Sequence, residues 1–225
     1  MDLHERYEEI LQRVARAAER SGRPSSAVTM IAVTKTLPAE RVRAAFGLGI
    51  RDIGENRVQE LLEKKSELTD LPIRWHLIGH LQSNKVKRIL PHVVLIHSVD
   101  SLPLGAQIDR LAAGGQAVDL LLEVNTSGEA TKFGVAPGEV RALASAVRGL
   151  NQLRVRGLMT LGPLTEDPAA IRASFRMLRE LLDAVREEIP DASVLSMGMS
   201  GDFEIAIEEG ATHIRVGTAL FGSRA

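Results

Sequence analysis

The feature of this sequence that most constrains its fold is an alternation of short apolar runs with longer segments of helical spacing. Near-continuous apolar runs are typical of parallel strands buried on both faces, and helices usually connect such strands. The eight runs occupy residues 28–34, 51–54, 74–80, 93–100, 118–125, 155–162, 193–198 and 212–217. Eight strand–helix units in about 200 residues predict an α/β protein, a (β/α)8 TIM barrel near the lower size limit of that fold. An open doubly wound sheet is the alternative that this pattern allows.

An extra helix is predicted ahead of the first strand, over residues 2–20, because apolar residues recur there at helical spacing until "SGRP" ends the pattern. The connecting helices are predicted at residues 39–48, 55–68, 81–90, 102–113, 137–150, 168–189 and 202–210, and a last turn runs to Ala225. No stretch has the composition of a linker, so we expect one domain over residues 1–225.

Charge and composition limit the classes of partner. The chain has 28 Lys and Arg against 29 Asp and Glu, a formal net charge of -1, and only 3% aromatic residues. Proteins that bind nucleic acids or membrane surfaces usually carry a basic surplus, so neither partner is expected. The first 20 residues are charged throughout, unlike a signal peptide, and no apolar run approaches the roughly 20 residues that cross a bilayer. We therefore expect a cytoplasmic protein.

Metal binding is not expected either. The sequence has no Cys, so thiolate ligands are excluded. His76 and His80 are four residues apart, but His76 falls inside a predicted strand, so the pair lacks the helical spacing of metal ligands.

Lys35 closes the first apolar run, "MIAV", at the end of the strand where barrels of this kind hold their active sites. Its ammonium group can extend into solvent or bind an anionic ligand, or its neutral amine can form a Schiff base. Asn56, in "GENR" after the second strand, is either a helix cap or a ligand contact.

Two loops have the character of phosphate-binding loops. "SMGMSGD" follows the seventh strand and "RVGTALFG" begins in the eighth, which are the strands whose loops commonly hold a phosphate in this fold. Glycines let the backbone approach an anion, while Ser200, Gly217 and Thr218 offer hydroxyl and N–H donors. The alternative is that the glycines form tight turns and that Ser200 is an N-cap.

Charged residues also occur within the apolar segments. Arg215 in "HIRVG" has apolar neighbours, and a buried guanidinium needs a partner. That partner is either Glu123 of "LLLEV", in an ion pair, or an electron-rich ligand atom. The pair Glu208–Glu209 is expected to be a solvated part of its helix.

Seven segments carry a resemblance to a known family. They are "AVTKT", "GENRVQE", "WHLIGHLQSNK", "HSVDS", "VNTSGEATKFGV", "RGLMTLG" and "SMGMSGDFEIAIEEGATHIRVGTALFG". In this order, and over nearly the whole chain, they resemble the YggS/PROSC family of pyridoxal 5'-phosphate (PLP) homeostasis proteins. The fold of that family is similar to the N-terminal barrel of alanine racemase, a fold-type III PLP-binding barrel.

The resemblance implies a cofactor and a role for each candidate residue. Lys35 would hold PLP as a Schiff base, and Arg215 would face the pyridine nitrogen. Ser200, Gly217 and Thr218 would bind the cofactor's phosphate, and Asn56 would lie beside the cofactor. Family members are described as PLP binders that maintain vitamin B6 balance, without an established catalytic activity.

The departures from the racemase pattern favour a carrier over an enzyme. A racemase needs a second acid/base opposite its lysine, and the one tyrosine here, Tyr7, lies in the leading helix, far from the predicted site. We therefore expect no catalytic residue, and a monomer that passes PLP to apo PLP-dependent enzymes by transaldimination during transient contact. The alternatives are a small fold-type III amino-acid racemase with His80 as its base, and a class I aldolase on a phosphorylated sugar. Lys132 is either a second PLP-reactive amine or a plain loop lysine.

Overall fold

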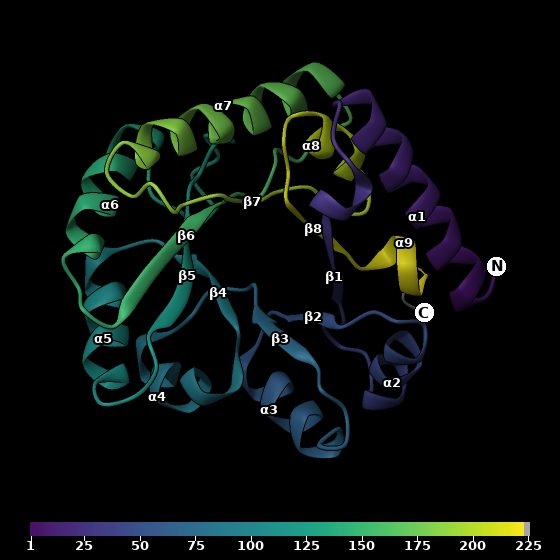
Figure 1. The fold of residues 1–225 in the computed structure, drawn as a ribbon, viewed down its shortest axis with the longest axis horizontal. Helices are drawn as coiled ribbons and strands as arrows, with labels where there is room; N and C mark the ends of the chain where they lie inside the picture. The colour runs from purple at the N-terminus through teal and green to yellow at the C-terminus, as the bar shows by residue number, and fades with distance from the viewer. Residues whose placement is uncertain (223–225) are drawn as a thin grey trace.

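The strands of this protein close into a barrel. The computed structural model describes residues 1–222, and in it eight parallel strands pair in the order β1 to β8 (Figure 1). Strand β8 also pairs with β1, from Thr29 opposite His213 to Ala32 opposite Val216, so the sheet has no free edge. The strands are β1 (Thr29–Val33), β2 (Asp52–Glu55), β3 (Arg74–Leu77), β4 (Leu95–Val99), β5 (Val118–Glu123), β6 (Leu153–Met159), β7 (Val194–Ser196) and β8 (His213–Val216). The predicted (β/α)8 barrel is confirmed, and the open-sheet alternative is wrong.

Helices surround the barrel on the outside, as Figure 1 shows. They are α1 (Leu3–Arg20), α2 (Ala39–Gly47), α3 (Val58–Glu67), α4 (Val86–Ile89), α5 (Leu102–Ala112), α6 (Val140–Arg148), α7 (Pro168–Arg186), α8 (Phe203–Glu208) and α9 (Thr218–Phe221). Their apolar faces pack on the outer side of the strands, and this layer holds most of the buried hydrophobic residues. Among residues 1–222, no helix is both long and apolar enough to cross a membrane.

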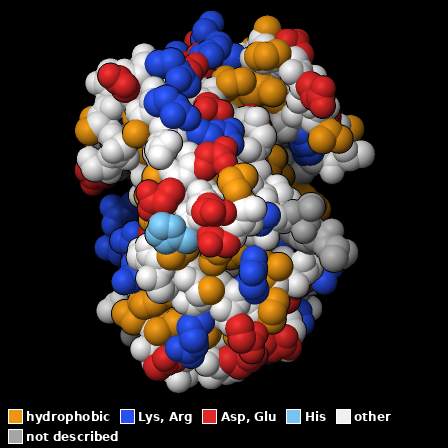
Figure 2. Space-filling model, turned by 90° about the vertical axis from the view of Figure 1, so that its right-hand side faces the viewer, with side chains coloured by type: hydrophobic (Ala, Val, Ile, Leu, Met, Phe, Trp, Pro, Cys, Tyr) orange, Lys and Arg blue, Asp and Glu red, His pale blue; other side chains and the backbone are white. Residues whose placement is uncertain are grey.

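Helix α1 is the predicted extra helix, and it lies beside α8 and α9 (Figure 1). It begins with a capping box in which the Asp2 side chain accepts from the backbone N–H of Glu5 and the Glu5 side chain accepts from that of Asp2. Its outer face is mixed in charge, and Figure 2 shows acidic and basic side chains interspersed over this side of the molecule. Ion pairs tie the helix to α8: Arg13 to Glu204 at 2.8 Å and Arg20 to Glu208 at 2.6 Å.

The barrel interior is packed with side chains rather than hollow, as this fold requires. Leu95, Leu121 and Met159 form an apolar cluster inside it. Two strands need glycine at a position where residues of a neighbouring strand approach closely. A Cβ at Gly54 would lie 2.8 Å from Ile31 Cγ2, and one at Gly157, where φ is 155°, would overlap the backbone of β7.

Three predictions on the helical layer need comment. The helix expected over residues 81–90 is reduced to the 3-10 turn Ser83–Lys85 and the short α4, followed by another 3-10 turn. Glu209 was expected to be solvated, which is wrong: it is only 4% exposed, because three arginines of α7 reach its carboxylate. The expected last turn is α9, while residues 223–225 of that prediction lie outside the described part of the chain.

Candidate cofactor-binding site

The predicted site residues gather at the C-terminal ends of four neighbouring strands, at the end of the barrel that we call the mouth. Lys35 and Asn56 lie just beyond β1 and β2, whereas Ser200 lies in the loop after β7. Gly217 links β8 to α9, and Thr218 is the first residue of that helix. Because β7, β8, β1 and β2 are consecutive around the closed sheet, these loops face one another across a single part of the mouth.

Lys35 is half-buried directly after β1. Within residues 1–222, its Nζ atom has no hydrogen-bond acceptor and no ion-pair partner, so its amine is available to a ligand. The next residue, Thr36, has a φ of 64°, a left-handed conformation that is strained for a β-branched side chain. The Thr36 backbone N–H donates to Glu60 Oε2 at 2.8 Å, which fixes this turn. Strained backbone of this kind is often found at functional sites.

A buried cluster behind β1 anchors the strand just before Lys35. Lys64 on α3 donates to the Thr34 carbonyl at 2.7 Å and to Glu55 Oε1 at 2.5 Å. The Thr34 hydroxyl donates to the same Glu55 oxygen. Since α3 lies outside the barrel, Glu55 is turned away from the mouth, and burial raises the pKa of its carboxyl.

The two predicted phosphate-binding loops meet through Ser200. Its Oγ accepts from the backbone N–H of Gly217 and of Ala219, both at 3.2 Å. The alternative, that Ser200 caps the helix of its own loop, is wrong, because α8 begins at Phe203 with Asp202 at its N-cap position. Gly198 in the first loop has a φ of 91°, and a Cβ there would lie 2.5 Å from that of Ala206.

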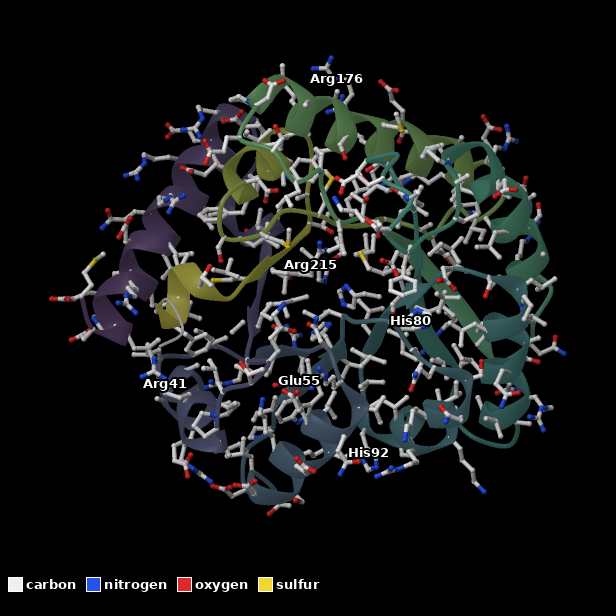
Figure 3. All side chains as sticks on the ribbon, turned by 180° about the vertical axis from the view of Figure 1, so that it is seen from behind. Arg41, Glu55, His80, His92, Arg176 and Arg215 are labelled. Carbon is white, nitrogen blue, oxygen red and sulfur yellow. The ribbon has the colours of Figure 1, made fainter. Side chains whose placement is uncertain are left out.

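Arg215 is 3% exposed and lies near the centre of the ring of strands, whereas Arg41, His92 and Arg176 lie on the outer layer (Figure 3). Its Nη1 donates to Ser196 Oγ at 2.6 Å and its Nη2 to the Thr160 carbonyl at 2.7 Å. Burial lowers its pKa to about 10, against the attraction of nearby carboxylates. Two neutral acceptors leave N–H donors of the guanidinium available to a ligand.

Of the two partners that the sequence allows for Arg215, the ion pair with Glu123 is not formed within residues 1–222. Glu123 ends β5, is 4% exposed, and its carboxyl has no hydrogen bond to any residue that the structure describes. Burial, with the charge of Asp100, raises its pKa to about 7. The reason is geometric: the guanidinium is held instead by Ser196 and by the backbone of Thr160.

The other rim residues differ in availability. Asn56 is half-buried and is not a helix cap, because Arg57 precedes α3. His80 is exposed at the mouth, where its ring stacks on Phe133 with centroids 4.2 Å apart. Lys132 is occupied, since its Nζ donates to Glu129 at 2.7 Å and to the Gly162 carbonyl at 2.6 Å.

Below Arg215, the structure shows a hydrogen-bonded set of interior residues that the sequence analysis missed. It contains Ser196, His97, His76 and Asp52, all buried. Because side chains alternate between the two faces of a strand, the sequence can indicate which residues point into the barrel. Nothing in the sequence indicates which inward residues of different strands lie at the same height and meet. In residues 1–222, no group of three or more His, Asp or Glu side chains has an arrangement that could hold a metal ion.

Comparison with known proteins shows the family of this chain. Residues 6–225 match the family model of the alanine racemase N-terminal domain. A pyridoxal phosphate homeostasis protein of Aquifex aeolicus is 46% identical over 100% of this chain and 99% of its own length. Another from Pseudomonas aeruginosa is 47% identical over 98% of this chain and 95% of its own. This chain belongs to the pyridoxal phosphate homeostasis protein family.

A solved structure extends the likeness to three dimensions. PipY of Synechococcus elongatus PCC7942, whose structure was solved with PLP bound, is 40% identical, and the two folds superpose with a TM-score of 0.85. The match covers 98% of this chain and 100% of PipY. The family resemblance predicted from the seven sequence segments is therefore confirmed, and this pyridoxal phosphate homeostasis family member has the alanine racemase-like barrel expected of it.

Proposed function

We propose that this chain binds PLP through a Schiff base to Lys35 and serves PLP homeostasis in the cytoplasm, as a single domain over residues 1–225. The names of its relatives and the PLP-bound structure of PipY support the cofactor. The observation that carries the proposal is a convergence of three features in one part of the mouth. Among residues 1–222, these are a lysine with an available amine, two joined glycine-containing loops, and a buried arginine without a carboxylate partner.

The donors present fit this cofactor. The N–H groups and hydroxyls of Ser200, Gly217 and Thr218 suit an anionic phosphate. Arg215 suits an acceptor such as the pyridine nitrogen, because its guanidinium only donates. Asn56 would lie beside the cofactor. PLP supplies an aldehyde carbon, to which the Lys35 amine adds with loss of the carbonyl oxygen as water.

We further propose a carrier rather than an enzyme, with no catalytic residue at the site. Tyr7, which belongs to α1 on the outside of the barrel, is too remote to act as an acid/base. An acceptor lysine from an apo PLP-dependent enzyme would replace Lys35 at the same carbon during transient contact, and the Lys35 amine would be restored. This exchange needs only one copy of the chain, so we propose a monomer.

The direct test is titration of the wild-type protein with PLP beside Lys35→Ala. We expect a visible absorption band in the wild type that is lost in Lys35→Ala and kept in Lys85→Ala, whose lysine lies elsewhere on the rim. Borohydride reduction followed by peptide mapping should place one PLP on Lys35. A wild type that stays colourless, or a label that persists on another lysine in Lys35→Ala, would contradict the proposal.

Deuterium exchange in D2O distinguishes the carrier from the racemase alternative. A carrier should give no deuterium exchange at Cα for any of a panel of amino acids incubated with the PLP-loaded protein. Exchange that disappears in His80→Ala would instead establish the racemase-type alternative.

A further inference from the structure

Five hydrogen-bonded side chains cross the barrel interior from Arg215 to Asp52. Arg215 Nη1 lies 2.6 Å from Ser196 Oγ, which lies 3.0 Å from His97 Nδ1. His97 Nε2 lies 3.0 Å from His76 Nδ1, and His76 Nε2 lies 2.9 Å from Asp52 Oδ1. The strands β4 and β7 are not neighbours in the sheet, so the bond between His97 and Ser196 spans the interior.

The hydrogens of this chain can be assigned one after another. Burial would raise the pKa of Asp52, but its hydrogen bonds from His76 and Arg74 outweigh that effect and hold the pKa below its ordinary value. Its carboxylate therefore only accepts, so His76 carries a hydrogen on Nε2, and a ring that carries its one hydrogen there accepts at Nδ1. His97 must then donate from Nε2.

The same logic continues to the mouth. Burial holds the pKa of His97 well below its ordinary value, so the ring is neutral and its Nδ1 accepts from the Ser196 hydroxyl. Ser196 in turn accepts from Arg215. In each of the four hydrogen bonds the donor is therefore the residue nearer to Arg215 and the acceptor the residue nearer to Asp52. We call these five side chains the relay.

The surroundings of the relay leave its direction intact. His213 lies beside it, with its ring centroid 6.4 Å from those of His76 and His97, but its Nδ1 is paired with the Thr212 hydroxyl. Burial lowers the pKa of His213 to about 4, so this ring is neutral. Arg74 approaches from the far side of Asp52 and bonds to Oδ2, leaving Oδ1 to His76.

We propose that Asp52 is a remote positioning residue, which through His76, His97 and Ser196 fixes the hydrogen bond that orients Arg215 at the mouth. Arg215 has no ion pair among the described residues, so the relay links its buried charge to a carboxylate. Only the effect on PLP rests on the proposed function, because the relay consists of side chains of this chain alone.

The decisive variant is Asp52→Asn in cofactor-free protein. Because Arg74 can only donate, the new carbonyl should face Arg74 and the new amide N–H should face His76 Nε2. The three hydrogen bonds that join residue 52, His76, His97 and Ser196 then reverse, while Arg215, which can only donate, still donates to Ser196. His97 should therefore move its hydrogen from Nε2 to Nδ1, although it does not touch residue 52. Long-range ¹H–¹⁵N correlation of histidine-labelled protein measures this directly.

A matched control makes the same Asp-to-Asn substitution at a different position. Asp119 lies near the same end of the barrel but pairs with Arg154 and Arg156 instead of a histidine. Asp119→Asn should leave the hydrogen of His97 on Nε2. If His97 also keeps it there in Asp52→Asn, the relay is wrong.

Ser196→Ala tests the other end and stands alone if Asp52→Asn does not fold. Arg215 loses one acceptor, so PLP binding should weaken by about 3- to 10-fold, the effect of one net hydrogen bond. His97 should keep its hydrogen on Nε2, because Asp52 still sets the direction. Unchanged affinity, or a reversed His97, overturns the inference. A wild type that binds no PLP would refute the proposed function alone, while His97 in Asp52→Asn would still decide the relay.

Discussion

Two buried carboxyl groups of the same barrel stand in opposite surroundings. Asp52, at the start of β2, accepts from His76 and Arg74, and its pKa is lowered. Glu123, at the end of β5, has no hydrogen-bond partner in the described chain, and burial raises its pKa to about 7. One end of the barrel satisfies its own polar groups, while the mouth keeps polar groups that a ligand can satisfy.

Two lysines repeat the contrast around the end of β1. Lys64, on the helix side, is buried and donates to Thr34 and Glu55. Lys35, on the mouth side, is half-buried and has no such partner within residues 1–222. Two lysines near one strand end thus have separate tasks, since one stabilises the strand and the other is available for chemistry.

The largest effect is expected from Lys64→Met, which should leave the Glu55 carboxyl fully buried without a cation. Breaking a buried ion pair by removing one partner costs about 3–5 kcal/mol, and Glu55 Oε2 already lacks a hydrogen-bond partner. Urea unfolding at neutral pH measures the loss. Lys65→Met is the matched control on the same helix, because within the described chain Lys65 makes only a long bond of 3.3 Å to the His92 carbonyl, and we expect a loss below about 1 kcal/mol. Equal losses in the two variants would show that Lys64 anchors nothing.

The next largest effect concerns Glu123→Gln and its dependence on pH. The folded-state pKa of Glu123 is raised from 4.5 to about 7, so its contribution to stability is present below pH 4.5 and is lost as the pH rises through 7. At about 1.4 kcal/mol per pH unit, the loss is roughly 3 kcal/mol. Glutamine resembles the protonated acid and does not ionise, so the variant does not lose this stability as the pH rises. The free energy of unfolding of Glu123→Gln, relative to wild type, should therefore rise by that amount between pH 4.5 and pH 8.

Asp52→Asn provides the opposite control in the same measurement. Because the folded-state pKa of Asp52 is lowered, its contribution is present above pH 3.8 and is lost only as the pH falls below that value. The difference in free energy of unfolding from wild type should therefore change with pH between 4.5 and 8 for Glu123→Gln, and only below pH 3.8 for Asp52→Asn. If the free energy of unfolding of Glu123→Gln varied with pH as that of wild type does from pH 4.5 to pH 8, the mouth would hold no carboxyl group with a raised pKa at position 123.

The fold could be predicted because its signal is local. Each buried strand is an apolar run, so the predicted strand at 28–34 contains the observed Thr29–Val33. Lys35, Ser200 and Gly217 could be proposed as site residues because each stands at the end of such a run or just beyond it. The helix at 81–90 was predicted too long because Ser83–Lys85 forms a 3-10 turn before α4.

The relay and the environment of Glu209 could not be predicted, because both depend on contacts between distant segments. His97 and Ser196 are 99 residues apart and meet only through the stagger of the closed barrel. Glu209 looked like an exposed helix charge until α7 placed Arg172, Arg176 and Arg179 around it. Periodicity gives the face on which a side chain lies, and tertiary packing decides what it contacts there.

The smallest effect is expected at Thr36, where the mouth stores strain beside Lys35. Glycine adopts a φ of 64° without strain, so Thr36→Gly should stabilise the protein by about 1 kcal/mol after the added entropy of its unfolded chain. Thr36→Asn also tolerates this conformation, but it restricts the turn more than glycine does. If the rigid turn positions Lys35, Thr36→Gly should load PLP more slowly despite its greater stability, whereas Thr36→Asn should load at the wild-type rate. Equal loading rates in all three proteins would mean that the strain belongs to the turn alone, and that the mouth differs from the opposite end of the barrel only in its unpaired polar groups.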